Sequence, residues 1–166
     1  RQRQMCIRDR GIIALSACLG GIYAGCYWEN REEGPRAVKQ AMRDMTVKML
    51  NVFGDRWYGE LQWNAVPDQH ELNRYVIQMH KEFGIPLVST ADSHYPTPTA
   101  WKDRELYKRL GFINRPNKPE WMTTELPDGV DEIGYELYPK NGDQMWEAYK
   151  EYSEKAGVQY DDNLIH

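Results

Sequence analysis

The chain has 166 residues, which suffices for one domain with a hydrophobic core and is short for two. Hydrophobic residues make up 41% and charged residues 28%, a composition that excludes disordered and collagen-like chains. No apolar run approaches the roughly 20 residues of a membrane-spanning helix, so we expect no membrane segment. The net charge is −4, and the chain as a whole lacks the basic character of free-standing nucleic-acid binders.

The cysteines and the two ends bear on compartment and completeness. Cys6, Cys18 and Cys26 are an odd number, which argues against a disulfide framework and favours a reducing cytoplasm. Residues 1–10 are basic but lack the order of a signal peptide, and we expect a non-native or disordered leader, with a natural basic arm as the alternative. Residues 161–166 are typical of the start of a helix, so both ends indicate a fragment of a longer chain.

Three apolar segments predict β-strands. Residues 11–16 form a short apolar run that leads into glycines, which indicates a buried strand ending in a tight turn. Residues 56–62 predict a second strand and residues 85–92 a third. Pro86 lies near the start of the third strand, where the missing hydrogen-bond donor costs least.

Helices are predicted between and after these strands. Pro35 opens a helix with apolar residues at helical spacing, and Gly54 ends it. Asp68 and Glu71 predict a capping box for the next helix, which ends at Gly84. The remaining expected helices span residues 98–110 and 143–156.

The order of these elements predicts the fold class. Strands and helices alternate through the first two-thirds of the chain, which favours an α/β fold with parallel strands covered by helices. Residues 114–132 are rich in proline, asparagine and charge and indicate a long loop, whereas residues 136–138 suit a short strand. We therefore expect one α/β domain part in residues 11–112, followed by a loop and helical extension in residues 113–166.

The sharpest local feature is the sequence Asp92-Ser-His94 at the end of the third predicted strand. Side chains alternate along a strand, so Asp92 and His94 should point to the same side. The carboxyl ends of parallel strands are where α/β proteins build their sites. A carboxylate beside an imidazole suits a divalent metal, or a base held by an acid. The alternative is a turn in which Asp92 caps a local amide and His94 has no role.

Three further residues are site candidates. Cys18 follows the first predicted strand, beside Gly20 and Gly21, where the backbone can approach a ligand closely. Its thiolate could bind a soft or borderline metal, and the alternative is a small buried hydrophobe. Glu60 and Gln62 share one face of the middle strand and could orient metal ligands or substrate, the alternative being ordinary hydrogen-bonded strand residues.

Other features point less clearly to chemistry. His70 and His80 lie on one predicted helix without the spacing of a metal pair, so we interpret them as surface or helix-packing residues. No phosphate-binding glycine loop, G-x-S-x-G elbow, C-x-x-C pair or H-E-x-x-H motif occurs. One group of aromatic residues could stack nucleic-acid bases, although packing is the favoured interpretation in an acidic chain. This group comprises Trp121, Tyr135, Tyr138, Trp146 and Tyr149.

Three sequence blocks, in order, resemble the PHP (polymerase and histidinol phosphatase) domain. They are LSACLGG at 15–21, FGDRWYGELQ at 53–62 and IPLVSTADSHY at 85–95. The most similar form of the domain heads the α subunit of bacterial and phage DNA polymerase III. Tyr138 to Asn141, with Met145, resembles the segment that leads toward the polymerase core. Departures from the family pattern fall at Ala17, Gly59, Ser89 and Ala91.

This resemblance implies a distorted TIM-like (β/α) barrel, of which the chain would carry a C-terminal part with a helical extension. It also implies a cluster of divalent metal ions (zinc, manganese or magnesium) at the strand ends. By resemblance Cys18, Asp92 and His94 match metal ligands, whereas Glu60 matches a family motif without being a ligand. The family's other ligands would precede residue 11, so we expect the fragment alone to be inactive.

The resemblance also implies a function for the parent chain. A replicative DNA polymerase is a nucleotidyltransferase that uses DNA and deoxynucleotides and works with other replisome subunits in the cytoplasm. This part would be its metal-dependent phosphoesterase, acting as a 3′–5′ proofreading exonuclease, or a structural support. The alternatives are a stand-alone PHP-type phosphoesterase and a non-catalytic docking module. Bacterial and phage origins both stay open.

Overall fold

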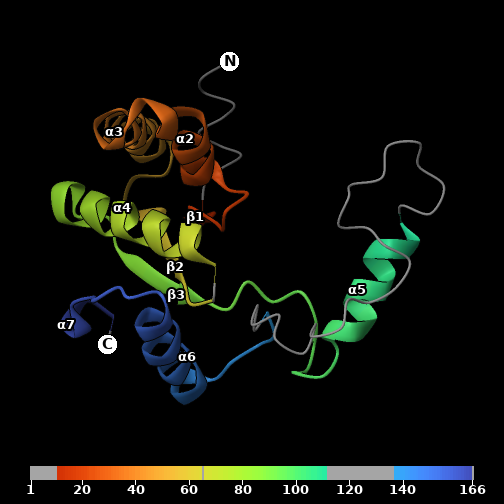
Figure 1. Cartoon of the computed structure of the whole chain (residues 1–166). Coiled ribbons are helices and arrows are strands. Elements are labelled where there is room, and N and C mark those ends of the chain that lie inside the picture. Colours follow the sequence, from red (N-terminus) through yellow and green to blue (C-terminus); the bar gives the residue numbers. More distant parts are fainter. Residues whose placement is uncertain (1–10, 65, 112–136, 166) are drawn as a thin grey trace.

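A computed structural model describes residues 11–64, 66–111 and 137–165 (Figure 1). The strands are β1 (Ala14–Leu15), β2 (Trp57–Gln62) and β3 (Leu87–Thr90). Short 3-10 turns at Arg31–Glu33 and Gly54–Arg56 flank the helix Pro35–Phe53. The described helices are α2 (Ile22–Asn30), α3 (Pro35–Phe53), α4 (Pro67–Phe83), α5 (Trp101–Leu110), α6 (Gly142–Lys155) and α7 (Asp162–Ile165).

The three described strands form one parallel sheet in the order β1-β2-β3. Ala14 pairs with Trp57 on one side of β2, and Gln62 pairs with Thr90 on the other. Figure 1 shows α2 and α3 above the strands, α4 above β2 and β3, α6 and α7 below them, and α5 to the right. The predicted α/β fold with parallel strands is confirmed. The sheet of the described residues is open, and the barrel stays a prediction.

The two faces of β2 explain how the helices cover the sheet. Gly59 faces α4, and a Cβ added there would lie 2.7 Å from Cγ1 of Val76 and 3.0 Å from Cδ2 of Leu87. Glycine at this position therefore lets α4 approach the strand closely. Because side chains alternate along a strand, Glu60 and Gln62 lie on the opposite face.

The core lies between the sheet and the helices that cover it. Trp57 is 1% exposed, and its ring meets the Tyr23 ring edge-on with centroids 5.6 Å apart. The hydroxyl groups of Tyr23 and Thr46 lie 2.6 Å apart, so the buried polar atoms of this region pair with one another. On α4, Leu72, Val76 and Met79 are buried in this core, and Phe83 is partly buried against it.

The boundaries of α3 and the end of α4 agree with the sequence, but the predicted capping box is wrong. Pro67 occupies the first turn of α4 and Val66 is its N-cap, so Asp68 already lies inside the helix. The carboxylates of Asp68 and Glu71 instead accept hydrogen bonds from the Tyr27 hydroxyl, at 2.9 and 2.8 Å. Burial, together with these two carboxylates, raises the pKa of Tyr27.

Two predictions for the start of the described chain need correction. The first strand is not buried: β1 has two residues and pairs only with β2 in the described sheet, and Ile13 is 59% exposed and Leu15 38%. Helix α2 was not expected from the sequence. Its N-cap is Gly21, which has no side chain to cap the helix, and Gly25 lies within the helix.

Toward the C-terminus the helices agree closely with expectation. Helix α5 begins at Trp101, three residues later than predicted, and α6 begins with a capping box formed by Asn141 and Gln144. A short strand was predicted at residues 136–138. Its described residues, Leu137 and Tyr138, are not in a strand, so the prediction is wrong for these two residues. No described helix has both the length and the apolar character to cross a membrane. Several predictions concern residues outside the described part of the chain. These are residues 1–10 with Cys6, residues 114–132, and Trp121, Tyr135 and Glu136.

His70 is a packing residue in a buried position, 1% exposed. Its Nδ1 lies 2.8 Å from the Tyr160 hydroxyl and its Nε2 lies 2.8 Å from the Asn64 carbonyl oxygen. Since a carbonyl only accepts, Nε2 carries the proton in the neutral ring. His70 thereby ties the start of α4 to the segment before α7.

The burial of His70 predicts a pH-dependent stability. Burial lowers the pKa of His70 from 6.5, so the unfolded chain takes up a proton before the folded chain as pH falls. The stability contributed by neutral His70 is therefore present above pH 6.5 and is lost as the pH falls below it. Thermal melts at about pH 7.5 and about pH 5.5 should show a larger drop in Tm for the unmodified chain than for His70→Gln. His80→Gln is the control, and equal slopes for the unmodified chain and His70→Gln would contradict the prediction.

Candidate functional site

The predicted site residues lie at or near the carboxyl ends of the three described strands. Cys18 lies in the turn after β1, Gln62 is the last residue of β2, and Asp92 follows β3 by two residues. Parallel pairing brings these three strand ends to one edge of the sheet. This is the edge at which open parallel sheets hold their ligands.

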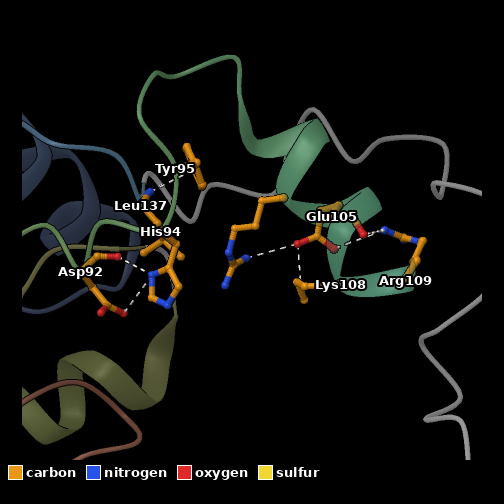
Figure 2. Close-up of polar contacts among 8 residues, drawn as sticks. Asp92, His94, Tyr95, Glu105, Lys108, Arg109 and Leu137 are labelled. Carbon is orange, nitrogen blue, oxygen red and sulfur yellow. Dashed lines mark hydrogen bonds and ion pairs between the residues drawn. The ribbon is translucent and has the colours of Figure 1, made fainter. Parts of the chain in front are cut away.

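Asp92 and His94 lie together, though not through strand alternation. β3 ends at Thr90, and Asp92 has a φ of +47°, the left-handed conformation that aspartate tolerates better than most residues. His94 Nδ1 lies 2.5 Å from the Asp92 carbonyl oxygen and 3.8 Å from its carboxylate Oδ2 (Figure 2). The irregular segment after β3, rather than the strand itself, therefore brings the pair together.

The ring of His94 is held in one tautomer by this contact. Because the Asp92 carbonyl oxygen only accepts hydrogen bonds, Nδ1 carries the proton in the neutral ring, which leaves Nε2 with its lone pair. A histidine that donates one ring N–H to a carbonyl and offers the other nitrogen is the usual arrangement at metal sites. The side chain of His94 is 39% exposed and that of Asp92 26%, so a ligand can reach both.

The turn after β1 presents Cys18 at the same edge of the sheet. Ala17 has a φ of +63°, and a Cβ added to Gly21 would lie 2.3 Å from the Ser16 carbonyl oxygen. Glycine is therefore required at 21 for the chain to turn this tightly. The Gly20 amide donates to the Cys18 sulfur at 3.5 Å. Cys18 is partly exposed, unlike the small buried hydrophobe of the alternative interpretation.

Glu60 and Gln62 form a buried hydrogen-bonded pair on β2. Gln62 Nε2 donates to Glu60 Oε1 at 2.9 Å, and the Thr90 hydroxyl donates to the same oxygen at 2.5 Å. Glu60 is 8% exposed and Gln62 2%. The backbone N–H of Glu60 donates to the Ser16 hydroxyl at 2.8 Å, which links this pair to the end of β1. Thr90 was not identified from the sequence as a member of this hydrogen-bonded group. Its position two residues before Asp92, near the end of the third predicted strand, could have indicated it.

The donor atoms suit a divalent metal in kind, but the described residues do not complete a site. Thiolate, imidazole and carboxylate are the ligands that zinc takes. Within residues 11–64, 66–111 and 137–165 no three His, Cys, Asp or Glu side chains lie close enough to hold a metal ion. The structure thus brings Asp92 and His94 together and does not gather Cys18 with them. On this edge of the sheet the buried Gln62 Oε1 has no hydrogen-bond partner among the described residues, so its acceptor capacity is unused.

Sequence comparison identifies relatives of one kind. The chain is 39% identical over 88 residues to DNA polymerase III subunit alpha of Aquifex aeolicus, across 53% of this chain and 7% of that protein. The Thermus aquaticus subunit is 32% identical over 90 residues, across 52% of this chain and 6% of that protein. The Campylobacter jejuni subunit is 24% identical over 149 residues, across 88% of this chain and 12% of that protein.

The chain therefore spans only a small part of the length of these curated relatives. No protein-family model matches it. The similarity to these subunits extends over about half to 88% of the chain. The chain is related to a part of the α subunit of bacterial DNA polymerase III.

Proposed function

We propose that the chain is part of the PHP domain of a replicative DNA polymerase α subunit, in which Cys18, Asp92 and His94 contribute ligands to a divalent metal site. The observation that carries the proposal is the similarity to DNA polymerase III subunit alpha, which recurs in relatives from different bacteria. Residues 11–112 would belong to the PHP domain, and residues 113–166 would lead toward the polymerase core. DNA, deoxynucleotides and other replisome subunits would be partners of the whole polymerase in the cytoplasm.

The arrangement at the strand ends supports phosphoester hydrolysis as the chemistry. A bound divalent metal, whether zinc, manganese or magnesium, lowers the pKa of water and polarises a phosphoryl oxygen. His94 Nε2 and the Asp92 carboxylate would hold such an ion, with the Cys18 thiolate from the turn after β1, which β2 separates from β3. The Asp92 carbonyl keeps the His94 ring in the tautomer that this role needs. In the polymerase this site would serve 3′–5′ proofreading.

A non-catalytic docking role is the second candidate, and α5 favours it. Its charged residues turn toward one another: Glu105 is 6% exposed and accepts from Lys108 at 2.9 Å (Figure 2). Its apolar side chains instead face solvent, which is typical of a surface that a protein partner covers. The exposed apolar residues of α5 are Leu106, Tyr107 and Leu110.

Metal binding by the chain distinguishes the two candidates. Equilibrium dialysis with Zn²⁺ or Mn²⁺ should show weak binding, because only part of a ligand set is present. Asp92→Asn and His94→Gln should each weaken that binding by about tenfold or more, since each removes a charged or nitrogen donor.

The matched controls are Asp44→Asn, on the exposed surface of α3, and His80→Gln, on α4. Both should leave the dissociation constant unchanged. Equal affinity in all four variants and the unmodified chain would remove Asp92 and His94 from the site and leave docking as the better function.

A further inference from the structure

The amide of Gln62 has a fixed orientation that leaves its oxygen unused. Glu60 Oε1 already accepts from Gln62 Nε2 at 2.9 Å and from the Thr90 hydroxyl at 2.5 Å. A carboxylate only accepts, so it selects the amide orientation with Nε2 toward Glu60. Turning the amide around would place Gln62 Oε1 against the carboxylate, which is repulsive. The oxygen of Gln62 is therefore held away from Glu60.

This oxygen is buried and needs a donor. Gln62 is 2% exposed, and its Oε1 is the one buried side-chain nitrogen or oxygen atom of the described residues without a hydrogen-bond partner. An unpaired buried acceptor lowers the stability of the folded chain, so such atoms are normally satisfied by ordered water or by a ligand. The position lies at the strand ends, because Gln62 ends β2 and pairs with Thr90, two residues before Asp92.

We propose that Gln62 is a positioning residue whose Oε1 binds a water molecule at the carboxyl ends of the strands, in an orientation that Glu60 and Thr90 enforce. The amide oxygen offers only an acceptor, and the Glu60 carboxylate beside it repels anions. The position therefore takes a donor such as water and rejects a phosphate oxygen. The inference deepens the hydrolytic function proposed above and rests on it for the role of this water, which Gln62 would hold beside the metal ligands.

Crystal structures of the unmodified chain and of two variants test the proposal. In the unmodified chain a water oxygen should lie about 2.7–3.2 Å from Gln62 Oε1. Gln62→Met keeps the length of the side chain without its acceptor and should lack this water. The double variant Glu60→Gln with Gln62→Glu keeps one amide, one carboxylate and an acceptor at 62. It should have both the water and the Tm of the unmodified chain. A dry Oε1 packed against carbon, or a water that persists in Gln62→Met, overturns the proposal.

Gln69→Met is the matched control, because it removes a second buried amide, on α4, that donates to Asn73 rather than to Glu60. It should leave the water at 62 in place. If Gln62→Met does not fold, the exchange variant and the single Gln62→Glu variant decide: the exchange should keep the water, and Gln62→Glu, with two adjacent carboxylates, should lower the Tm.

Zn²⁺ affinity separates this inference from the proposed function. Gln62→Met should bind Zn²⁺ within about threefold of the unmodified chain, because the hydrogen bonds of the Gln62 amide go to Glu60 and Thr90 and not to a proposed metal ligand. Zn²⁺ binding that depends on Asp92 and His94, combined with a dry Gln62 Oε1, would end the inference and keep the function. Absent Zn²⁺ binding with water present at Oε1 would end the hydrolytic function and confirm the water position.

Discussion

Replacing Trp57 with alanine is expected to lower the free energy of unfolding by about 3–5 kcal/mol, the usual cost of removing a large buried aromatic side chain. Trp57 is 1% exposed. Its ring meets the Tyr23 ring edge-on at 5.6 Å and stacks on Phe53 at 6.4 Å, and its Nε1 donates to the Tyr23 hydroxyl at 3.2 Å. The truncation would leave a cavity where β2 meets α2 and α3. Urea denaturation followed by circular dichroism measures the loss.

Trp28→Ala is the matched control for Trp57. Trp28 is 38% exposed, and its Nε1 donates to the Leu19 carbonyl oxygen at 2.9 Å. Its removal should cost about 1 kcal/mol, because water can take over the hydrogen bond and no large cavity forms. Equal losses for the two tryptophans would show that Trp57 does not anchor the core.

The elements that sequence reasoning predicted well are those whose signals are local. Helix α3 combines apolar residues at helical spacing with Pro35 at its start and Gly54 after its end, all within one stretch of chain. Helix α2 has no comparable signal: glycine precedes it and Gly25 lies within it. It forms because Tyr23 and Tyr27 bury their rings against the core, which is a tertiary effect.

The capping box shows how a distant residue can override a local pattern. Asp68 and Glu71 have the spacing of a capping pair, yet both carboxylates accept from Tyr27, which lies 41 and 44 positions away in the chain. Pro67 supplies a helix start that needs no side-chain cap, since its ring fixes φ near the helical value. The carboxylates are thereby available for a contact that only the folded chain creates.

At the site, the sequence predicted which residues lie near the strand ends but not their backbone conformation or hydrogen bonds. Strand alternation predicted that Asp92 and His94 lie together, but β3 ends at Thr90, so the contact is present for a different reason. The left-handed backbone of Asp92 and the hydrogen bond from His94 Nδ1 to its carbonyl depend on how the chain leaves β3. Likewise the shared face of Glu60 and Gln62 follows from alternation, whereas their link to Thr90 depends on the register between β2 and β3.

Replacing Asn73 with alanine is expected to lower the free energy of unfolding by about 2–4 kcal/mol, because it leaves several buried polar groups without partners at once. Asn73 is 0% exposed and lies on α4. Its Nδ2 donates to the Gln62 carbonyl oxygen at 2.9 Å, and its Oδ1 accepts from Gln69 Nε2 at 3.0 Å and from the Gln62 N–H at 3.4 Å. Urea denaturation measures the loss of stability.

The same substitution should loosen the strand end that carries Gln62. Since Asn73 contacts both backbone polar groups of Gln62, hydrogen exchange at the Gln62 amide should quicken in Asn73→Ala beyond what the lower global stability explains. Asn51→Ala, on the exposed face of α3, is the control and should be neutral or slightly stabilising, because alanine favours helices. A loss below about 0.5 kcal/mol for Asn73→Ala, within the usual range of surface substitutions, would mean that α4 does not hold the end of β2. The positions of Gln62 and of its unused oxygen would then have to be set by Glu60 and Thr90 alone.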